Sequence, residues 1–220
     1  HSFSAEKTVT DLHPNYYSAS LYPNGIKIQH HEAHSASVIA EHKLHGEVLC
    51  FAFDGTGYGD DGAIWGSEVF RFNGKEFTRL EHLDYTLMPG SDEIAKDAEL
   101  CLSCYTGTNE LIEKAKAAGI NMVKCSSMGR LFDAVSALLG ICGKNTYEGE
   151  CAEKLEACAA LSKKPCKFTP RLSPKEIIEE ISKSDAPVQD RALGFHYMLA
   201  ELILKIAKKY SVRQIAPVSY

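Results

Sequence analysis

The first half of the chain carries hydrophobic patterns that are typical of β-strands. Residues 47–54 form an apolar run, and residues 63–72 and 76–83 form two further strand-like segments separated by glycine-rich turns. Asn73-Gly74, between the last two segments, is a strong hairpin signal. These patterns predict a three-stranded meander. A short strand over residues 26–29 and an amphipathic helix over residues 32–44 are expected before it.

Beyond Pro89-Gly90 the hydrophobic pattern becomes helical, with caps at Ser or Asn and stops at Gly. The predicted helices cover residues 91–104, 109–118, 128–139, 147–161, 173–181 and 191–210, and a last strand begins at 212–216. This order of elements is that of the ribonuclease-H-like unit that actin-like phosphotransferases use in pairs. We therefore expect an α/β chain of the actin-like (ASKHA) class. Residues 1–46 would be the end of one subdomain and residues 47–220 an incomplete second subdomain with a helical insertion.

Composition narrows the class of protein. The chain has 220 residues, 45% of them hydrophobic and 24% charged, as expected of a globular protein. A net charge of −5 offers no basic footprint for nucleic acid, and no apolar run is long enough to span a membrane. The chain does not begin with Met and carries no signal peptide, so we expect a fragment. Its eight cysteines lack a framework spacing, which favours a reduced, cytoplasmic compartment.

The histidine-rich stretch that follows the short strand predicts a metal site. His30 and His34 are four residues apart, so on a helix they share one face and can grip a single divalent ion. Asp54, at the end of the apolar run, is the natural third ligand. His31 points elsewhere and is expected to contact substrate or to support the ligands. The alternative is a solvated, histidine-rich helix start.

Residues 54–62 read DGTGYGDDG and predict a loop that contacts phosphate. Main-chain amides of Gly55, Gly57 and Gly59 would face phosphate oxygens, and Thr56 would add a hydroxyl. Asp60 and Asp61 either hold Mg²⁺ or merely solvate the loop. A polar hairpin turn is the simpler alternative for this composition.

Two later segments are candidates for the nucleoside side of the same site. Gly129 lowers helix propensity one turn into a predicted helix, which indicates a close approach by another group. Asp133 follows one turn later on the same face, where it would accept hydrogen bonds from ribose hydroxyls. Glu148 and Glu150 lie at the start of the next predicted helix and are either functional acids or capping charges.

In this order, these motifs strongly resemble the C-terminal part of the hydrogenase maturation carbamoyltransferase (HypF) family. That family carries elements written QHHHAH, DGTGYGxDGxIWGGE, PGGD, SSxGRLFDAVxALLG and YEGQAA. The matching segments here are residues 29–34, 54–68, 89–92, 126–140 and 147–152. Residues 11–16, DLHPNY, match a further family stretch, DLHPDY. The resemblance covers nearly the whole chain.

The resemblance implies an actin-like carbamoyltransferase domain, similar to threonylcarbamoyladenosine synthases. Such a domain would use carbamoyl phosphate and ATP with Mg, through carbamoyl adenylate, to carbamoylate the C-terminal cysteine of HypE for the nickel–iron site. It implies that His30, His34 and Asp54 carry the metal, iron or zinc, that holds the adenylate's phosphate. Gly129 and Asp133 would line the nucleoside side.

Departures from the family pattern leave alternatives open. Glu32 replaces a histidine, Ser67 and Ser91 replace glycines, and residues 99–105 lack an arginine- and tryptophan-containing segment. We expect an adenosine-binding element and a further aspartate ligand to lie beyond Tyr220 in complete members. A non-catalytic fragment that binds nucleotide or a HypE-like partner, with an exposed sheet edge that favours a homodimer, is one alternative. A small-molecule O-carbamoyltransferase is another.

Overall fold

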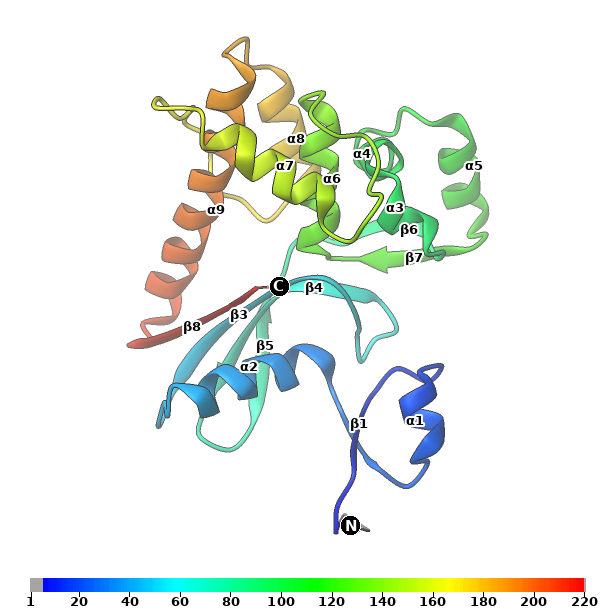
Figure 1. Ribbon diagram of the computed structural model, residues 1–220, viewed down its shortest axis with the longest axis vertical. Helices are drawn as coiled ribbons and strands as arrows, with labels where there is room; N and C mark the ends of the chain where they lie inside the picture. The colour runs from blue at the N-terminus through cyan, green and yellow to red at the C-terminus, as the bar shows by residue number, and fades with distance from the viewer. Residues whose placement is uncertain (1–5, 220) are drawn as a thin grey trace.

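The computed structural model describes residues 6–219 and shows an α/β architecture with helices on both faces of a mixed sheet (Figure 1). The α/β class expected from the sequence is confirmed. In chain order the elements are β1 (Val9–Asp11), α1 (Tyr17–Leu21), β2 (Ile26–Ile28), α2 (His30–Glu41), β3 (Val48–Tyr58), β4 (Ile64–Phe72), β5 (Phe77–Glu81), β6 (Thr86–Pro89), α3 (Glu93–Lys96), α4 (Ala98–Thr106), α5 (Glu110–Ala118), β7 (Met122–Cys125), α6 (Met128–Leu138), α7 (Glu150–Ala159), α8 (Pro174–Ser182), α9 (Val188–Tyr210) and β8 (Gln214–Ser219).

The larger sheet contains the predicted meander. Strand β3 runs antiparallel to β4, and β4 runs antiparallel to β5. The sheet order is β6-β7-β4-β3-β8, with β5 attached to the other half of β4. Strand β8 adds to β3 in the parallel sense, as a long helical crossover requires. Strands β1 and β2 form a separate parallel pair next to α1.

The centre of the sheet is buried on both faces. Leu49 and Phe51 of β3 face the cluster built from α4, α6, α8 and α9, while Val48 and Cys50 face the smaller cluster that includes Ile39 of α2. A strand covered on both faces needs apolar side chains at successive positions. This explains why β3 is a continuous hydrophobic run in the sequence.

The helical half differs from the predictions at its element boundaries. The helix expected over residues 91–104 is broken at Asp97, whose backbone is extended and whose side chain caps α4 by accepting from Leu100 N at 2.8 Å. Helix α7 begins at Glu150 because Gly149 has a φ of 81°. The strands β6 and β7 and the short helix α1 were not predicted, since each has only four or five residues and no clear period.

Helix α9 is the longest helix, with 23 residues. It packs Phe195, Met198 and Leu202 into the main cluster and exposes a charged face that includes Lys205 and Lys208. Among residues 6–219, no helix is both long and apolar enough to cross a membrane.

Candidate metal centre

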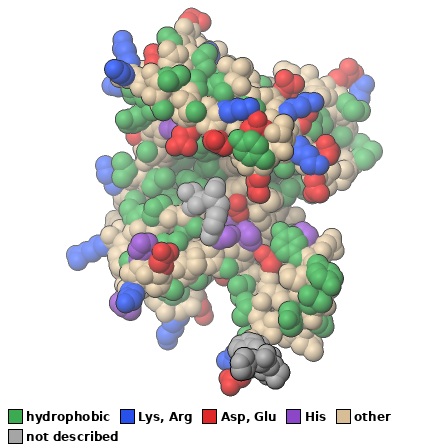
Figure 2. Space-filling view, viewed as in Figure 1, with side chains coloured by type: hydrophobic (Ala, Val, Ile, Leu, Met, Phe, Trp, Pro, Cys, Tyr) green, Lys and Arg blue, Asp and Glu red, His purple; other side chains and the backbone are tan. Residues whose placement is uncertain are grey.

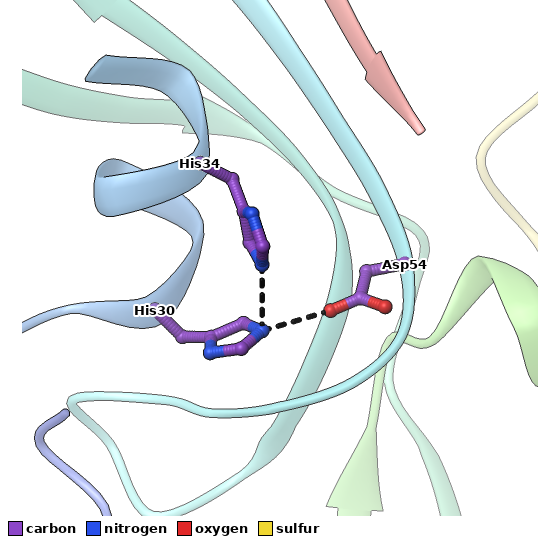
Figure 3. A group of neighbouring side chains, drawn as sticks. All are labelled: His30, His34 and Asp54. Atoms are coloured by element: carbon purple, nitrogen blue, oxygen red, sulfur yellow. Dashed lines mark hydrogen bonds and ion pairs between the residues drawn. The ribbon is translucent and has the colours of Figure 1, made fainter. Parts of the chain in front are cut away.

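Helix α2 begins directly at the histidine motif. Gln29 is its N-cap, and the Gln29 side chain accepts a hydrogen bond from Glu32 N at 2.9 Å. This cap fixes His30 in the first turn and places His34 one turn later on the same face. The two side chains converge, and their Nε2 atoms lie 3.0 Å apart (Figure 3).

Strand β3 brings Asp54 to the same point. Its Oδ2 lies 3.1 Å from His30 Nε2, and its Oδ1 accepts from Gly55 N at 2.6 Å. One ligand atom from each of His30, His34 and Asp54 lies within 4.8 Å of the others. The structure therefore brings together all three residues that the sequence predicts as metal ligands.

The geometry of these atoms fits a divalent ion. Two ligand atoms that each lie ~2.1 Å from one ion are ~3.0 Å apart when they subtend a right angle, and farther apart in a tetrahedron. The separations of 3.0 and 3.1 Å around His30 Nε2 are of this size. Two imidazole nitrogens and a carboxylate oxygen suit zinc and other first-row metals.

Asp11 completes the support of His30 and was not predicted as a site residue. Its Oδ2 lies 2.9 Å from His30 Nδ1, so the ring donates there and Nε2 faces His34 and Asp54. A carboxylate on the far ring nitrogen is the usual partner of a metal-bound histidine. The sequence indicates Asp11 only through its position at the start of the DLHPNY stretch, which matches the family.

His31 lies behind the ligands rather than among them. Its side chain is fully buried, and burial lowers the pKa of His31 to about 4, so the ring is neutral near pH 7. Its Nδ1 lies 3.3 Å from Gln29 Nε2. Within the described residues its Nε2 has no hydrogen-bond partner, and it faces Asp54 Oδ2 at 3.6 Å. The buried Nε2 of His31 thus has room for a further partner on the side of Asp54, where a metal-bound group would lie.

Neighbouring groups in the site shift one another's pKa values. Burial alone would raise the pKa of Asp54, but hydrogen bonds from His30 and Gly55 outweigh it and keep that pKa below its ordinary value. The hydrogen bond to Asp54 raises the pKa of His30, with a further contribution from Asp11. Burial and the neighbouring His30 lower the pKa of His34. The carboxylate is thus ionised at neutral pH, as ligation requires.

The glycine-rich segment is mostly strand, which corrects the prediction of a loop. Strand β3 continues to Tyr58, with an irregularity between Phe53 and Gly57 where the ladder to β4 shifts register. The turn that follows spans residues 59–62, and Gly62 has a φ of 75°. Thr56 and Asp60 are exposed. The hairpin reading therefore describes residues 59–62, and the strand accounts for the rest.

The glycines of this segment make room for neighbouring side chains. A Cβ on Gly57 would collide with the rings of His31 and His30, and one on Gly59 would collide with Trp65. The close approach predicted at Gly129 is made by Gly55, whose Cα would lie 2.7 Å from a Cβ at position 129. Helix α6 can therefore start directly against the end of β3, beside Asp54.

The remaining predicted site residues have other surroundings. Asp133 is buried, pairs with Arg130 at 3.1 Å and accepts from Asn145 Nδ2 at 3.0 Å. Burial raises the pKa of Asp133 despite the neighbouring arginine. Glu148 is exposed in the turn before α7. Protein groups thus hold Asp133, while Glu148 faces solvent.

Glu68 of β4 is a buried carboxylate that the sequence reasoning did not single out. It accepts from Ser126 Oγ at 2.7 Å, from Arg79 Nε at 2.6 Å and from the backbone amide of Gly66 at 3.2 Å. The adjacent Ser127 donates to Gly55 O at 2.7 Å and caps α6. Glu68 therefore ties β4, β5 and the start of α6 together next to the metal ligands. Its signals in the sequence are a charged residue within an apolar strand and its place as the last residue of the segment 54–68 that matches the family element.

Two protein-family models match this chain and show the family to which it belongs. Residues 50–219 match the model described as "Carbamoyltransferase, Kae1-like Domain, second subdomain", and residues 1–41 match the "HypF Kae1-like domain". The chain belongs to the HypF family. Its fold is accordingly the Kae1-like member of the ASKHA class that the sequence predicted.

Curated relatives in the HypF family are considerably longer than this chain. Carbamoyltransferase HypF of Synechocystis is 30% identical over 98% of this chain and 34% of its own length. Probable carbamoyltransferase HypF of Methanocaldococcus jannaschii is 30% identical over 92% of this chain and 31% of its own length. The chain therefore spans about a third of these relatives.

Solved HypF structures share the fold throughout. A full-length HypF in its phosphate- and nucleotide-bound form aligns with a TM-score of 0.85 at 29% identity, over 97% of this chain and 33% of that one. Thermococcus kodakarensis HypF aligns with a TM-score of 0.84, also at 29% identity, over 96% of this chain and 34% of that one.

The contact between Asp11 and His30 gives a first prediction. Asp11→Asn retains the side-chain volume but weakens the hold on the His30 ring, because a neutral amide replaces the carboxylate acceptor. We expect the affinity for Zn²⁺ to fall ~10–100-fold, as is typical when an outer partner of a metal ligand is lost. Zinc titration against a competing chelator measures the change. Asn15→Asp, an exposed change in the same stretch, is the control and should leave the affinity unaltered. Equal affinity of Asp11→Asn and the unaltered chain would contradict the role given to Asp11.

Proposed function

We propose that this chain is the part of a HypF carbamoyltransferase in which a carbamoyl group is passed from an adenylate to an acceptor thiol. The observation that carries the proposal is the convergence of His30, His34 and Asp54, with Asp11 behind His30, in a chain that matches HypF over nearly its whole length. Carbamoyl phosphate and ATP with Mg would be the sources of the carbamoyl adenylate, and the C-terminal cysteine of a HypE-like protein the acceptor.

The residues of the centre have separate tasks in this proposal. A divalent ion, iron or zinc, would act as a Lewis acid on the phosphate when bound. His30 and His34 hold their Nε2 atoms 3.0 Å apart toward that position, and Asp54 supplies a negative oxygen. With Nδ1 donating to Asp11, His30 would present an unprotonated Nε2 to the ion. The Gln29 N-cap fixes the first turn of α2 and therefore the positions of both histidines.

For the nucleotide, we propose the groups around the end of β3 and the start of α6. Thr56 and Asp60 are exposed there, Gly55 and Gly57 lie in the strand beside Asp54, and Gly59 begins the turn that follows. Gly129, in the first turn of α6, lies against Gly55, and we propose Asp133 and Glu148, farther along the chain, as the nucleoside-side groups. Support comes from the solved full-length HypF in its phosphate- and nucleotide-bound form.

We also propose a subdomain boundary and a cellular compartment. We place the boundary between the two ribonuclease-H-like subdomains at residues 46 and 47, in the loop between α2 and β3. We also place the protein in the cytoplasm, where its eight free cysteines would stay reduced. A non-catalytic role in binding nucleotide or partner is the second candidate function, since the chain spans only about a third of its relatives.

Two measurements together distinguish the two functions: carbamoyl-phosphate-dependent exchange of pyrophosphate into ATP, and transfer of the carbamoyl group to HypE. The chain is mixed with the segments of a longer HypF relative that it does not match, supplied as a separate protein. Transfer of the carbamoyl group to HypE is followed by mass spectrometry. We expect transfer that depends on this chain and is lost in the His34→Ala variant. Exchange without transfer to HypE, at every ratio of the two proteins, would leave only the binding role.

A further inference from the structure

Cys142 and Cys151 lie together in a small buried cluster away from the metal centre, and the function proposed above uses neither of them. With Ala98 they form the third apolar cluster of the described residues. The Sγ of Cys151 lies 3.6 Å from the carbonyl oxygen of Cys142, so it lies against the main chain of the other cysteine. Burial, with a further contribution from the neighbouring Cys142 side chain, raises the pKa of Cys151.

The two thiols differ in what surrounds them. Lys154, one turn after Glu150 on α7, places its Nζ 3.8 Å from the Sγ of Cys142. An ammonium group at this distance can stabilise the negative charge that develops on sulfur during thiol–disulfide exchange. Cys142 also retains 9% exposure, whereas Cys151 is fully buried. Cys142 is therefore the thiol that an incoming reagent reaches, and Cys151 is the neighbour that can displace it.

The sequence shows that this pair is a feature of the present chain. The family element is YEGQAA, and the corresponding residues 147–152 read YEGECA. Glu150 thus stands where the family pattern has glutamine, and Cys151 where it has alanine. Glu150 in turn binds Lys154 at 2.6 Å and accepts from Thr146 N at 2.6 Å. Both departures therefore contribute to one arrangement of two thiols and a lysine.

We propose that Cys142 and Cys151 are a redox-active dithiol that small-molecule disulfides convert to an intramolecular disulfide. The Cys142 thiolate attacks one sulfur of the reagent, forming a mixed disulfide and releasing one thiolate. Cys151 then gives up its proton to that thiolate or to solvent and attacks the Cys142 sulfur, which releases the second thiol. The two protein thiols lose two electrons and two protons, and the reagent is reduced to two thiols.

The cross-link closes a ring around the segment that contains Asn145. That residue donates through Nδ2 to Asp133 Oδ1 at 3.0 Å, and its Oδ1 accepts from Cys151 N at 2.8 Å. Its backbone N–H donates to Lys96 O at 2.8 Å. Oxidation would thus fasten the loop that holds Asp133 in place, and amide hydrogen exchange over residues 143–150 should slow in the oxidised chain.

The test is to treat the folded chain with glutathione disulfide, block free thiols with N-ethylmaleimide and map tryptic peptides by mass spectrometry. Cleavage after Arg130, Lys144, Lys154 and Lys163 puts Cys142, Cys151 and Cys158 in three separate peptides. We expect peptides 131–144 and 145–154 to be joined before any other pair, and to separate again with dithiothreitol. Cys158→Ala, on the same helix, should leave this result unchanged.

Two variants make the outcome decisive. Cys151→Ala restores the residue of the family element, so the chain should fold and retain glutathione on Cys142 as a stable mixed disulfide. Lys154→Gln should slow cross-linking several-fold. Unmodified Cys142 in the Cys151→Ala chain would overturn the proposal. Cross-linking of some other pair while Cys142 and Cys151 remain free would overturn it as well.

Discussion

His30→Ala is expected to abolish tight metal binding while leaving the fold intact. His30 is the residue that the other two ligands share, since its Nε2 lies 3.0 Å from His34 Nε2 and 3.1 Å from Asp54 Oδ2. Losing a direct ligand should lower the affinity by more than the ~10–100-fold typical of an outer partner. His34→Ala should have an effect of the same size, because both rings face the same point.

Metal retained per chain, measured by elemental mass spectrometry after dialysis against Zn²⁺ and then buffer, checks this result. His42→Ala is the matched control, because His42 is exposed at the C-cap of the same helix. Circular dichroism establishes that each variant is folded, so that a loss of metal reports on the site. If His30→Ala and His34→Ala retain as much zinc as His42→Ala, the assignment of the centre is wrong.

Glu68→Ala is expected to have the largest effect on stability. The Glu68 side chain is fully buried and serves as acceptor for Arg79, Ser126 and the Gly66 amide. Removing one partner of a buried ion pair leaves the other charge uncompensated, which typically costs ~3–5 kcal/mol. The Arg79 side chain remains 22% exposed, so water can partly solvate it and the lower end of this range is expected.

Urea unfolding of Glu68→Ala and Glu68→Gln measures this effect. Glutamine keeps an oxygen that can accept from Ser126 but lacks the charge that pairs with Arg79, so its loss should be smaller. Glu47→Ala is the control, because its ion pair with Arg71 is solvent-exposed and should contribute no more than ~1 kcal/mol. A change for Glu68→Ala no larger than the change for Glu47→Ala would contradict the buried network.

Much of the fold could be predicted because its main elements are long and regularly patterned. Strand β3 is apolar on both faces, and Asn73-Gly74 signals the hairpin between β4 and β5, so the meander could be predicted directly from the sequence. The four-residue strands β6 and β7 could not be predicted, because their pairing depends on contacts between segments far apart in the chain. The break at Asp97 was missed for a related reason: Lys144, a distant residue, bridges to it.

The metal ligands were predicted because helical spacing and strand position are local properties. Asp11 was missed because it lies in β1, a different sheet, and only the folded chain brings it to His30. The loop predicted over residues 54–62 failed for a steric reason. Glycine suggested a turn, whereas in the fold Gly57 and Gly59 leave space for large rings packed against a strand.

These ring-and-glycine contacts restrict which substitutions the chain can accept. Gly57 is matched in size to His31, and Gly59 to Trp65. A larger residue on one side of such a pair can be accommodated only if the partner shrinks. Substitutions at these positions should therefore be tolerated as compensating pairs and rejected singly. In evolution, side-chain volume should therefore limit the residues at this site as strongly as metal-binding chemistry does.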